Sequence, residues 1–319
     1  MLFIDYQESS NSQQKQNKFS LIPGMINTAD PPISILMTVY NREKYISEAI
    51  YSVLQSSYQN WELIIVDDRS SDRSVEIARQ FEKEDDRIKV YINEMNLGDY
   101  PNRMKAASYA RGKYLKYLDS DDTIQPQGLE IMVNAMEQFP DAGVGFSSSN
   151  YKSTSFPVSL SSKESIRYHF FEKIILSVGP SAAIYNHHFF KQIKGFENYG
   201  VASDYAFNLK ATLLKPIVIL KPGLIHWRRH DDQEIRKHEE DYMKMNHKIY
   251  CDYIFYTENL PTNQRREIRN NYKAVTGRKF LRKILTGDLN SAIKTAKATN
   301  LKFTDSINIF SPRKIRKYL

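Results

Sequence analysis

The sequence predicts an α/β fold built on a mostly parallel sheet with helices on both faces. Short apolar runs of strand length alternate with helical patterns from residue 33 to residue 118. Such alternation is typical of parallel strands joined by crossover helices. Three of the four runs end in polar or acidic residues. Because ligands bind beyond the carboxyl ends of parallel strands, the same pattern predicts a site at that edge of the sheet.

The first half of the chain has the clearest elements. Strands are expected over residues 33–39, 62–66, 88–92 and 114–118. Helices are expected over residues 43–56, 72–83 and 101–111, where apolar side chains recur on one face. Gly112 is a good terminator for the last of these helices.

The second half is less regular. Strands are expected over residues 142–146, 182–185, 217–220 and 224–227. Helices are expected over residues 165–176, 204–214, 234–257, 263–285 and 289–298. Residues 150–162 are rich in serine and are expected to form a loop.

The charge of the chain is unevenly distributed. The net charge is +8, but residues 261–319 hold 15 of the 45 Lys and Arg and only 3 of the 37 Asp and Glu, so this segment is +12 and the rest is −4. With no recognisable nucleic-acid module, we expect no nucleic-acid partner. A basic amphipathic segment such as 261–319 can lie on an anionic membrane surface. The alternative is a helix packed on the domain with its basic face in solvent.

Signals of cellular compartment are few. Cys251 is the single cysteine, so no disulfide within the chain is possible, which fits a reducing compartment. The first residues lack the pattern of a signal peptide, and no window of about 18 uncharged apolar residues exists. We expect a cytoplasmic protein, with peripheral attachment to the inner face of the cytoplasmic membrane as an option.

An acidic cluster directly follows the strand expected at residues 114–118. Asp119, Asp121 and Asp122 lie within four residues, and carboxylates this close repel one another unless a cation compensates. Mg²⁺ and Mn²⁺ prefer oxygen ligands and bridge phosphate oxygens. The alternative is a solvated turn that caps the next helix. Asp67 and Asp68, at the end of another strand, favour the metal–phosphate site.

The usual phosphate-binding loops are absent from the sequence. Neither the glycine-rich dinucleotide fingerprint nor the P-loop pattern occurs. A nucleotide would therefore be held by carboxylates, a metal and an aromatic ring, and Tyr40 is placed for such a stack. A nucleotidyltransferase uses similar chemistry but usually has a glycine-rich basic loop after its first strand, which residues 40–42 do not provide.

Several segments in the expected order resemble family-2 glycosyltransferases of the kind that build bacterial cell-surface polysaccharides. They are residues 33–41, 61–72, 96–98, 112–122, 195–196, 202–205 and 227–230. The resemblance implies the GT-A fold. It also implies three parts: a flexible lead-in over residues 1–30, a GT-A catalytic domain over residues 31–235 and a basic helical extension over residues 236–319.

The resemblance implies a donor-nucleotide site. Thr38 and Tyr40 match residues that hold the base, with Tyr40 stacking on it. Asp68 matches an aspartate that accepts a hydrogen bond from uracil, which points to a UDP-sugar. Asp119 and Ser120 belong to the D-x-D motif and would face the donor nucleotide.

The metal and the reaction are implied in the same way. Asp121, the second acid of the D-x-D motif, and His230 match metal ligands, with Mn²⁺ or Mg²⁺ as the cofactor. The alternative for His230 is a structural histidine, which is the more usual role of a lone histidine near a strand. Asp204 matches the catalytic base, although it could simply cap the helix that follows. Arg228 or the neighbouring Arg229 could pair with the diphosphate.

The implied activity is transfer of a hexosyl or N-acetylhexosaminyl group with inversion. The donor would be a nucleotide-sugar, with a UDP-sugar favoured, and the acceptor a saccharide or lipid-linked saccharide. A non-catalytic nucleotide-sugar-binding or scaffold protein on the same fold is the first alternative, because fold does not determine function. A nucleotidyltransferase is the second.

Overall fold

The computed structural model describes residues 32–228, 239–255, 258 and 260–301. The contacts divide the chain into two units, residues 1–30 and 31–319, and only the second contains described residues. The lead-in expected over residues 1–30 therefore lies outside the described residues, and so does His230.

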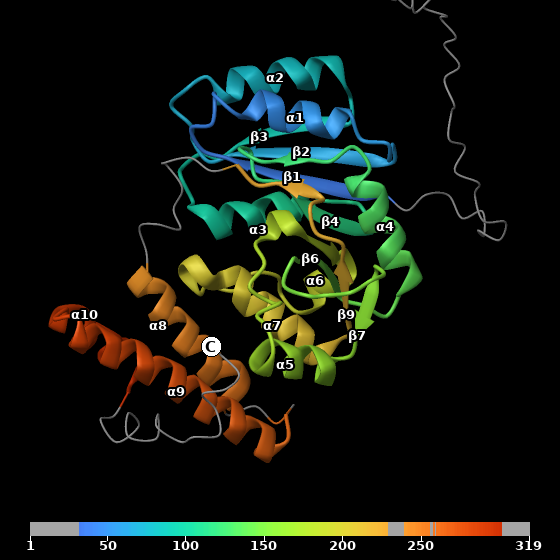
Figure 1. Cartoon of the computed structure of the whole chain (residues 1–319). Coiled ribbons are helices and arrows are strands. Elements are labelled where there is room, and N and C mark those ends of the chain that lie inside the picture. Colours follow the sequence, from blue (N-terminus) through green and yellow to red (C-terminus); the bar gives the residue numbers. More distant parts are fainter. Residues whose placement is uncertain (1–31, 229–238, 256–257, 259, 302–319) are drawn as a thin grey trace, which may run out of the picture. The chain divides into compact units, whose positions relative to one another are not determined.

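An eight-stranded mixed sheet forms the centre of the described chain, in the order β3-β2-β1-β4-β8-β6-β9-β7 (Figure 1). Its first half consists of parallel neighbours: β1 (Ile33–Val39), β2 (Trp61–Asp67), β3 (Ile88–Ile92) and β4 (Tyr114–Tyr117). The prediction of parallel strands is therefore confirmed for this half, and its polar strand ends lie on one edge.

The second half of the sheet changes direction. β8 (Ala183–Asn186) pairs antiparallel with both β4 and β6 (Val144–Ser147). β9 (Ile217–Leu220) runs parallel to β6, and β7 (Val158–Leu160) runs antiparallel to β9 at the edge. The expectation of a continuous loop over residues 150–162 is wrong at β7, because a three-residue edge strand is too short to show a period of two.

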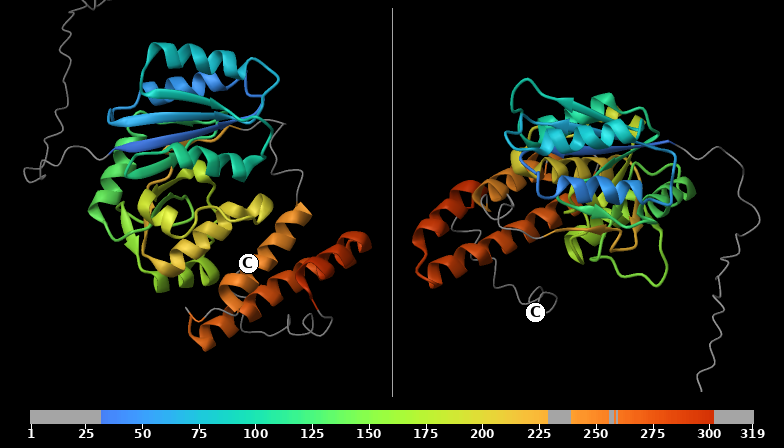
Figure 2. Two further views of the ribbon diagram at one scale, coloured as in Figure 1. Left: turned by 180° about the vertical axis from the view of Figure 1, so that it is seen from behind. Right: turned by 90° about the horizontal axis from the view of Figure 1, so that it is seen from above.

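Alternating side chains divide the core into two layers, and Figure 2 shows helices on both faces of the sheet. Ile35 and Met37 pack in one layer, which also contains the apolar faces of α1 (Ile46–Leu54), α2 (Ser74–Glu84) and α4 (Gly128–Gln138). Leu36 packs in the other layer, with α3 (Asp99–Tyr109), α5 (Ser162–Phe171), α6 (His187–Gln192) and α7 (Ser203–Leu214). Helices on both faces follow from this period of two.

The strand β5 (Thr123–Ile124) forms where the sequence pattern predicts no element, and the helix that the acidic turn at residues 119–122 was expected to cap in the alternative interpretation begins only at Gly128, so the turn does not cap it. β5 pairs antiparallel with β10 (Ile225–His226) apart from the main sheet, and α4 follows it. A two-residue strand carries no periodic signal, and α4 begins at a glycine without a side-chain cap. Helix α5 also ends five residues before the expected residue 176, although a capping box between Ser161 and Glu164 fixes its start.

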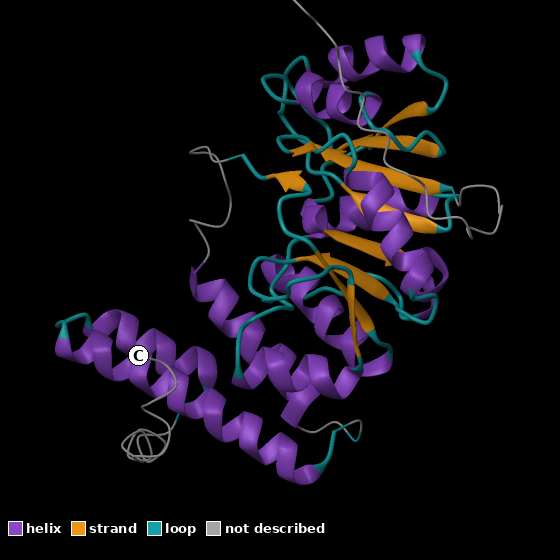
Figure 3. Cartoon of the chain, turned by 45° about the vertical axis from the view of Figure 1, so that its right-hand side comes forward, coloured by secondary structure: helices purple, strands orange, loops and turns teal. Residues whose placement is uncertain are grey.

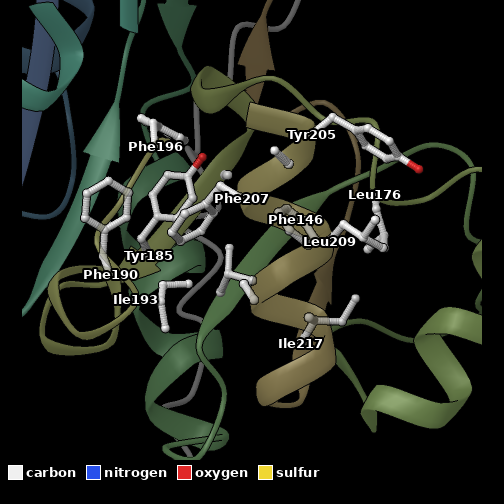
Figure 4. Close-up of a cluster of buried hydrophobic side chains, with 14 of the residues drawn as sticks. Phe146, Leu176, Tyr185, Phe190, Ile193, Phe196, Tyr205, Phe207, Leu209 and Ile217 are labelled. Carbon is white, nitrogen blue, oxygen red and sulfur yellow. The ribbon is translucent and has the colours of Figure 1, made fainter. Parts of the chain in front are cut away.

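A group of aromatic rings packs beneath the start of α7 (Figure 4). The ring centroid of Phe207 lies 5.2 Å from that of Tyr185, 4.9 Å from that of Phe190 and 5.4 Å from that of Phe196. Most of these contacts are edge-to-face, which is the favourable geometry for aromatic pairs. Tyr205 starts from the same helix but directs its ring away from this group. The packing gives the first turn of α7 a rigid support.

The C-terminal region is helical, as predicted (Figure 3). It contains α8 (Glu239–Tyr250), the π-helical segment η4 (Cys251–Phe255), α9 (Thr262–Leu285) and α10 (Leu289–Thr299). α9 is attached to the domain, since the Asn271 side-chain amide donates a 2.9 Å hydrogen bond to the Phe170 carbonyl. Among the described helices, none combines the length and apolar character needed to cross a bilayer.

Candidate active site

A cleft of ≈670 Å³ opens at the carboxyl ends of β1, β2 and β4. Seven of the eight predicted site residues line it: Thr38, Tyr40, Asp68, Asp119, Ser120, Asp121 and Asp204. The eighth, His230, lies outside the described residues. Residues more than 160 positions apart in the sequence therefore share one cavity.

The exits of β1 and β2 are fixed to each other. Asn41 adopts a left-handed backbone with φ of 52°. Its N–H donates a 2.9 Å bond to Ser70 Oγ, and its Oδ1 accepts a 2.8 Å bond from the Ser71 N–H. Asparagine tolerates this conformation better than most residues. The turn leaves the Tyr40 side chain at the rim of the cleft, where the residue is 49% exposed.

Asp68 is buried and organises the loop at residues 96–98. Its carboxylate accepts 2.8 Å bonds from the backbone N–H groups of Leu97 and Gly98 and from the Asn93 side chain. Gly98 has a φ of 85°, which most side chains disfavour. The carboxylate has lone pairs beyond these three bonds, and it still lines the cleft.

Arg103 is the main counter-charge of the acidic turn at residues 119–122. Its guanidinium lies 2.7 Å from Asp119 Oδ1, and its Nε donates a 2.8 Å bond to Asp99 Oδ1. Burial opposes ionisation of Asp119, but Arg103 outweighs it and lowers the pKa of the carboxyl below its ordinary value. Arg103 itself is buried, and its pKa is raised by the two carboxylates although burial acts against it.

Asp121 and Asp122 face different partners. Asp121 accepts a 3.1 Å bond from Arg42 Nε. Asp122 Oδ1 accepts a 3.1 Å bond from the Arg228 N–H, whereas its buried Oδ2 has no hydrogen-bond partner in the described chain. Burial, together with the nearby Asp119 and Asp121 carboxylates, raises the pKa of Asp122 to about 7. Asp122 therefore gains a proton closer to neutral pH than an ordinary aspartate does.

Two further contacts fix the acidic turn from behind. Ser120 Oγ donates a 2.9 Å bond to the Thr38 carbonyl, which joins the turn to the end of β1. Lys116 is fully buried and its ammonium donates to the carbonyls of Tyr117 and Ser181, while the Asp119 N–H donates to Ser181 Oγ at 2.9 Å. Burial lowers the pKa of Lys116 to about 7, although the Asp119 and Asp122 carboxylates oppose this.

Asp204 lies in the first turn of α7 and lines the cleft. α7 follows β8, the strand at which the sheet changes direction. Asp204 Oδ1 accepts a 2.7 Å bond from the Tyr205 N–H, but α7 already begins at Ser203 and has Ala202 as its N-cap without a side-chain cap, so the alternative that Asp204 caps this helix is wrong. Burial raises the pKa of Asp204 to about 6, although hydrogen bonds from Tyr205 and Tyr100 and the charge of Arg103 oppose the rise. A carboxylate with such a pKa can both gain and lose a proton near neutrality.

Several cleft residues were missed by sequence reasoning. Asp99, Tyr100 and Arg103 come from α3, which the sequence pattern predicts only as a covering helix. The spacing of Asp99 and Arg103, four apart on a helix, was a usable signal. A second usable signal was Lys116, a charged residue within an otherwise apolar strand. Arg228, considered for diphosphate, instead donates to the Asp121 carbonyl and to Glu48.

A comparison with known protein families identifies the family of this chain. Residues 34–195 match the family described as Glycosyl transferase family 2. This chain belongs to that family. The family-2 resemblance inferred from the motifs is therefore confirmed.

Curated family-2 relatives match over part of their length. A Haemophilus influenzae glycosyltransferase is 44% identical over 108 residues, which cover 34% of this chain and 43% of that protein. WfgD of Escherichia coli, named as a UDP-Glc:alpha-D-GlcNAc-diphosphoundecaprenol beta-1,3-glucosyltransferase, is 41% identical over 104 residues, or 33% of this chain and 40% of WfgD. The chain thus spans less than half the length of these relatives.

Solved structures confirm the GT-A fold. Staphylococcus aureus TarS 1–349, solved with UDP-GlcNAc, superposes with a TM-score of 0.62 at 17% identity, covering 85% of this chain and 93% of that one. The mannosyltransferase PcManGT from Pyrobaculum calidifontis, solved with GDP-Man and Mn²⁺, superposes with a TM-score of 0.60 at 13% identity, covering 88% and 79%. At these identities the likeness concerns the fold alone.

Proposed function

We propose that this family-2 chain is an inverting glycosyltransferase that moves a hexosyl or N-acetylhexosaminyl group from a nucleotide-sugar to a saccharide or lipid-linked saccharide acceptor. The observation that carries the proposal is that one cleft is lined by Tyr40, Asp68 and the acidic turn and also by Asp204. Binding groups for a nucleotide diphosphate and a proton acceptor are both needed for sugar transfer. A scaffold protein would need only the former.

The donor site is assigned to the first half of the sheet. The exposed Tyr40 ring would stack on the base, and Thr38 and Asp68 would hold its polar edge. Asp119 and Ser120 would face the ribose and the diphosphate. A UDP-sugar is the first choice of donor, in keeping with the UDP-Glc in the name of WfgD and the UDP-GlcNAc complex of TarS.

A divalent cation, Mn²⁺ or Mg²⁺, fits the acidic turn. Asp122 Oδ2 has no hydrogen-bond partner in the described chain, and burial together with the Asp119 and Asp121 carboxylates raises the pKa of Asp122, so a cation would stabilise the ionised turn. No group of three or more Asp, Glu, His and Cys suited to a metal occurs in the described chain, so the donor phosphates would supply the remaining ligands. Asp121, with His230, would hold the ion, which neutralises charge on the departing diphosphate when bound.

Asp204 would act as the general base. Its carboxylate accepts the proton of the acceptor hydroxyl as that oxygen attacks the anomeric carbon and the bond to the nucleotide diphosphate breaks. A positioned base typically contributes about 10²- to 10⁴-fold. Direct displacement by the acceptor inverts the anomeric centre and needs one carboxylate, which agrees with Ser203 in place of a second acid.

A donor screen tests the proposed activity. Nucleotide release is measured from UDP-glucose, UDP-GlcNAc and GDP-mannose with Mn²⁺, with and without a GlcNAc-diphospholipid analogue as acceptor. We expect release above background from a UDP-sugar and stimulation by a suitable acceptor. Release of pyrophosphate from a nucleoside triphosphate and a sugar phosphate would instead indicate a nucleotidyltransferase. Tight UDP binding without any turnover would indicate a scaffold.

The C-terminal helices would attach the protein to the anionic inner face of the cytoplasmic membrane. α9 carries eight Lys and Arg and one acidic residue. The turn from α9 to α10 exposes large apolar side chains: Leu285 is 86%, Leu289 59% and Ile293 52% exposed. Apolar side chains beside basic residues suit an anionic lipid surface. α9 also packs on the domain, so packing and membrane attachment are compatible.

Flotation with phosphatidylglycerol vesicles tests this attachment. We expect the wild-type chain to float and Leu285→Glu combined with Leu289→Glu to remain in the soluble fraction. Met95→Glu is the matched control, because Met95 is 65% exposed but lies in the first half of the chain. Equal soluble fractions for wild type and the double variant would rule out this membrane contact.

A further inference from the structure

One turn of the C-terminal helices contacts the chain on both sides of Asp204. This turn, residues 250–253, lies where α8 ends and the π-helical segment η4 begins. π-Helical segments are rare and are frequent at functional sites. α8 also packs against η2 (Gly200–Ala202), and its Tyr242 lines the main cleft.

The loop before Asp204 is held by two hydrogen bonds to the 250–253 turn. The Tyr199 hydroxyl donates a 2.7 Å bond to Asp252 Oδ2, and the Tyr253 hydroxyl donates to Glu197 Oε2. Burial and the Asp252 carboxylate raise the pKa of Tyr199 to about 12, so its hydroxyl remains a donor at neutral pH. Hydrogen bonds to charged groups are stronger than neutral ones.

Glu197 is fixed a second time from within the domain. The Lys210 ammonium on α7 lies 2.9 Å from Glu197 Oε1 and also donates a 2.9 Å bond to the Ile193 carbonyl. The loop that leads to Asp204 is therefore anchored to its own helix at one end and to the C-terminal helices along its length.

The residue after Asp204 is anchored as well. His169 Nδ1 accepts from the N–H groups of Ile175 and Leu176 at 3.2 Å, so its proton is on Nε2, which donates to the Tyr205 hydroxyl at 2.9 Å. The Tyr205 hydroxyl can then donate to the Tyr250 hydroxyl at 3.2 Å. Burial lowers the pKa of His169 to about 3, which keeps the ring neutral.

We propose that Tyr250, Asp252 and Tyr253 are positioning residues that hold Asp204 at the acceptor side of the cleft, so that the C-terminal helices form part of the active site. The inference rests on the proposed function, in which Asp204 is the base. It adds that α8 presents Tyr242 to the acceptor saccharide, whose apolar ring face suits an aromatic side chain.

Paired substitutions test the positioning role. Asp252→Ala removes the acceptor for Tyr199, whereas Asp252→Asn keeps an oxygen that can accept this bond. With UDP-glucose, UDP-GlcNAc and GDP-mannose as donors, we expect kcat for nucleotide release to fall about tenfold in Asp252→Ala. The donor KM should stay within about twofold and Asp252→Asn should recover most of the rate. Amide hydrogen exchange over residues 197–205 should accelerate by about the same factor.

Tyr272→Phe is the matched control. Tyr272 bonds His247 at 3.1 Å within the C-terminal helices, so its loss weakens them without touching the loop before Asp204. A kcat that falls equally in Tyr272→Phe, or stays at the wild-type value in Asp252→Ala, overturns the inference. A wild-type chain that releases no nucleotide from any donor overturns the proposed function, whereas exchange over 197–205 still reports whether the 250–253 turn holds the loop.

Discussion

Two carboxyl groups that line the same cleft have pKa values shifted in opposite directions. Asp119, after β4, lies 2.7 Å from the buried Arg103 guanidinium, and its pKa is lowered. Asp204, at the start of α7, is held by a backbone N–H and the Tyr100 hydroxyl, and burial raises its pKa to about 6. Burial acts to raise the pKa of both carboxyls, so burial alone does not set the direction of the shift.

The difference lies in the nature of the neighbours. A full positive charge keeps Asp119 ionised, which suits a group that meets a ribose or a cation. The charge of Arg103 also lowers the pKa of Asp204, but burial outweighs this charge and the hydroxyl and N–H donors, so Asp204 can take a proton near neutral pH. Pairs of carboxyls whose environments separate their pKa values are a recognised sign of divided roles.

The largest expected effect follows from removing the charge of Asp204. Asp204→Asn should lower kcat for sugar transfer by about 10²- to 10⁴-fold, because the amide cannot accept the proton of the acceptor hydroxyl. UDP binding by calorimetry should be unchanged. Asp141→Asn, an exposed aspartate, is the control. Full turnover by Asp204→Asn would remove this residue from the mechanism.

Removing the counter-charge of Asp119 should destabilise the fold. Arg103→Met leaves Asp99 and Asp119 without their shared guanidinium and should lower the free energy of unfolding by about 3–5 kcal/mol, measured in urea. The free energy of unfolding of Arg103→Lys should lie between those of the wild type and Arg103→Met, because an ammonium cannot reach both carboxylates with the same geometry. A loss below about 1 kcal/mol would mean that the turn does not depend on this ion pair.

Asp121→Ala addresses the metal on the charged wall. We expect the Mn²⁺-dependent part of UDP binding, measured by calorimetry, to weaken by about 10- to 100-fold. UDP binding in EDTA should change little. Identical Mn²⁺ dependence in wild type and variant would assign the cation to other residues.

The pH dependence of kcat is expected to show the smallest effect, but it distinguishes Asp204 from Asp119 most specifically. Because Asp204 acts in its ionised form and its pKa is raised to about 6, kcat should be about half-maximal near pH 6 and fall about tenfold per unit below it. The lowered pKa of Asp119 keeps that carboxylate charged over this range, so Asp119 itself should add no pH dependence to UDP binding. A kcat that is constant down to pH 5 would contradict the assignment of Asp204.

The sequence predicted the first half of the sheet well because its strands are apolar runs separated by periodic helices. The pairing of β4 with β8 brings Asp204 to the same cleft, but the sequences of these two strands do not indicate that they pair. Only the family resemblance predicted that Asp204 belongs to the site. Arg103 and Lys116 were not foreseen because their importance lies in burial next to Asp119, a property of tertiary packing. The strands β5 and β7 were not predicted, because strands this short show no period of two.

The position of the 250–253 turn limits how this enzyme can be recombined with its relatives. The family match ends at residue 195, before Asp204 and well before Tyr250, Asp252 and Tyr253. A chimera joined at residue 235 would pair Asp204 with foreign helices and break the bonds to Tyr199 and Glu197. An exchange of residues 32–124, the part proposed to bind the donor, keeps these contacts together. We therefore expect donor preference to be the easier property to transfer between relatives. Acceptor preference should be transferred only when the C-terminal helices are exchanged as well.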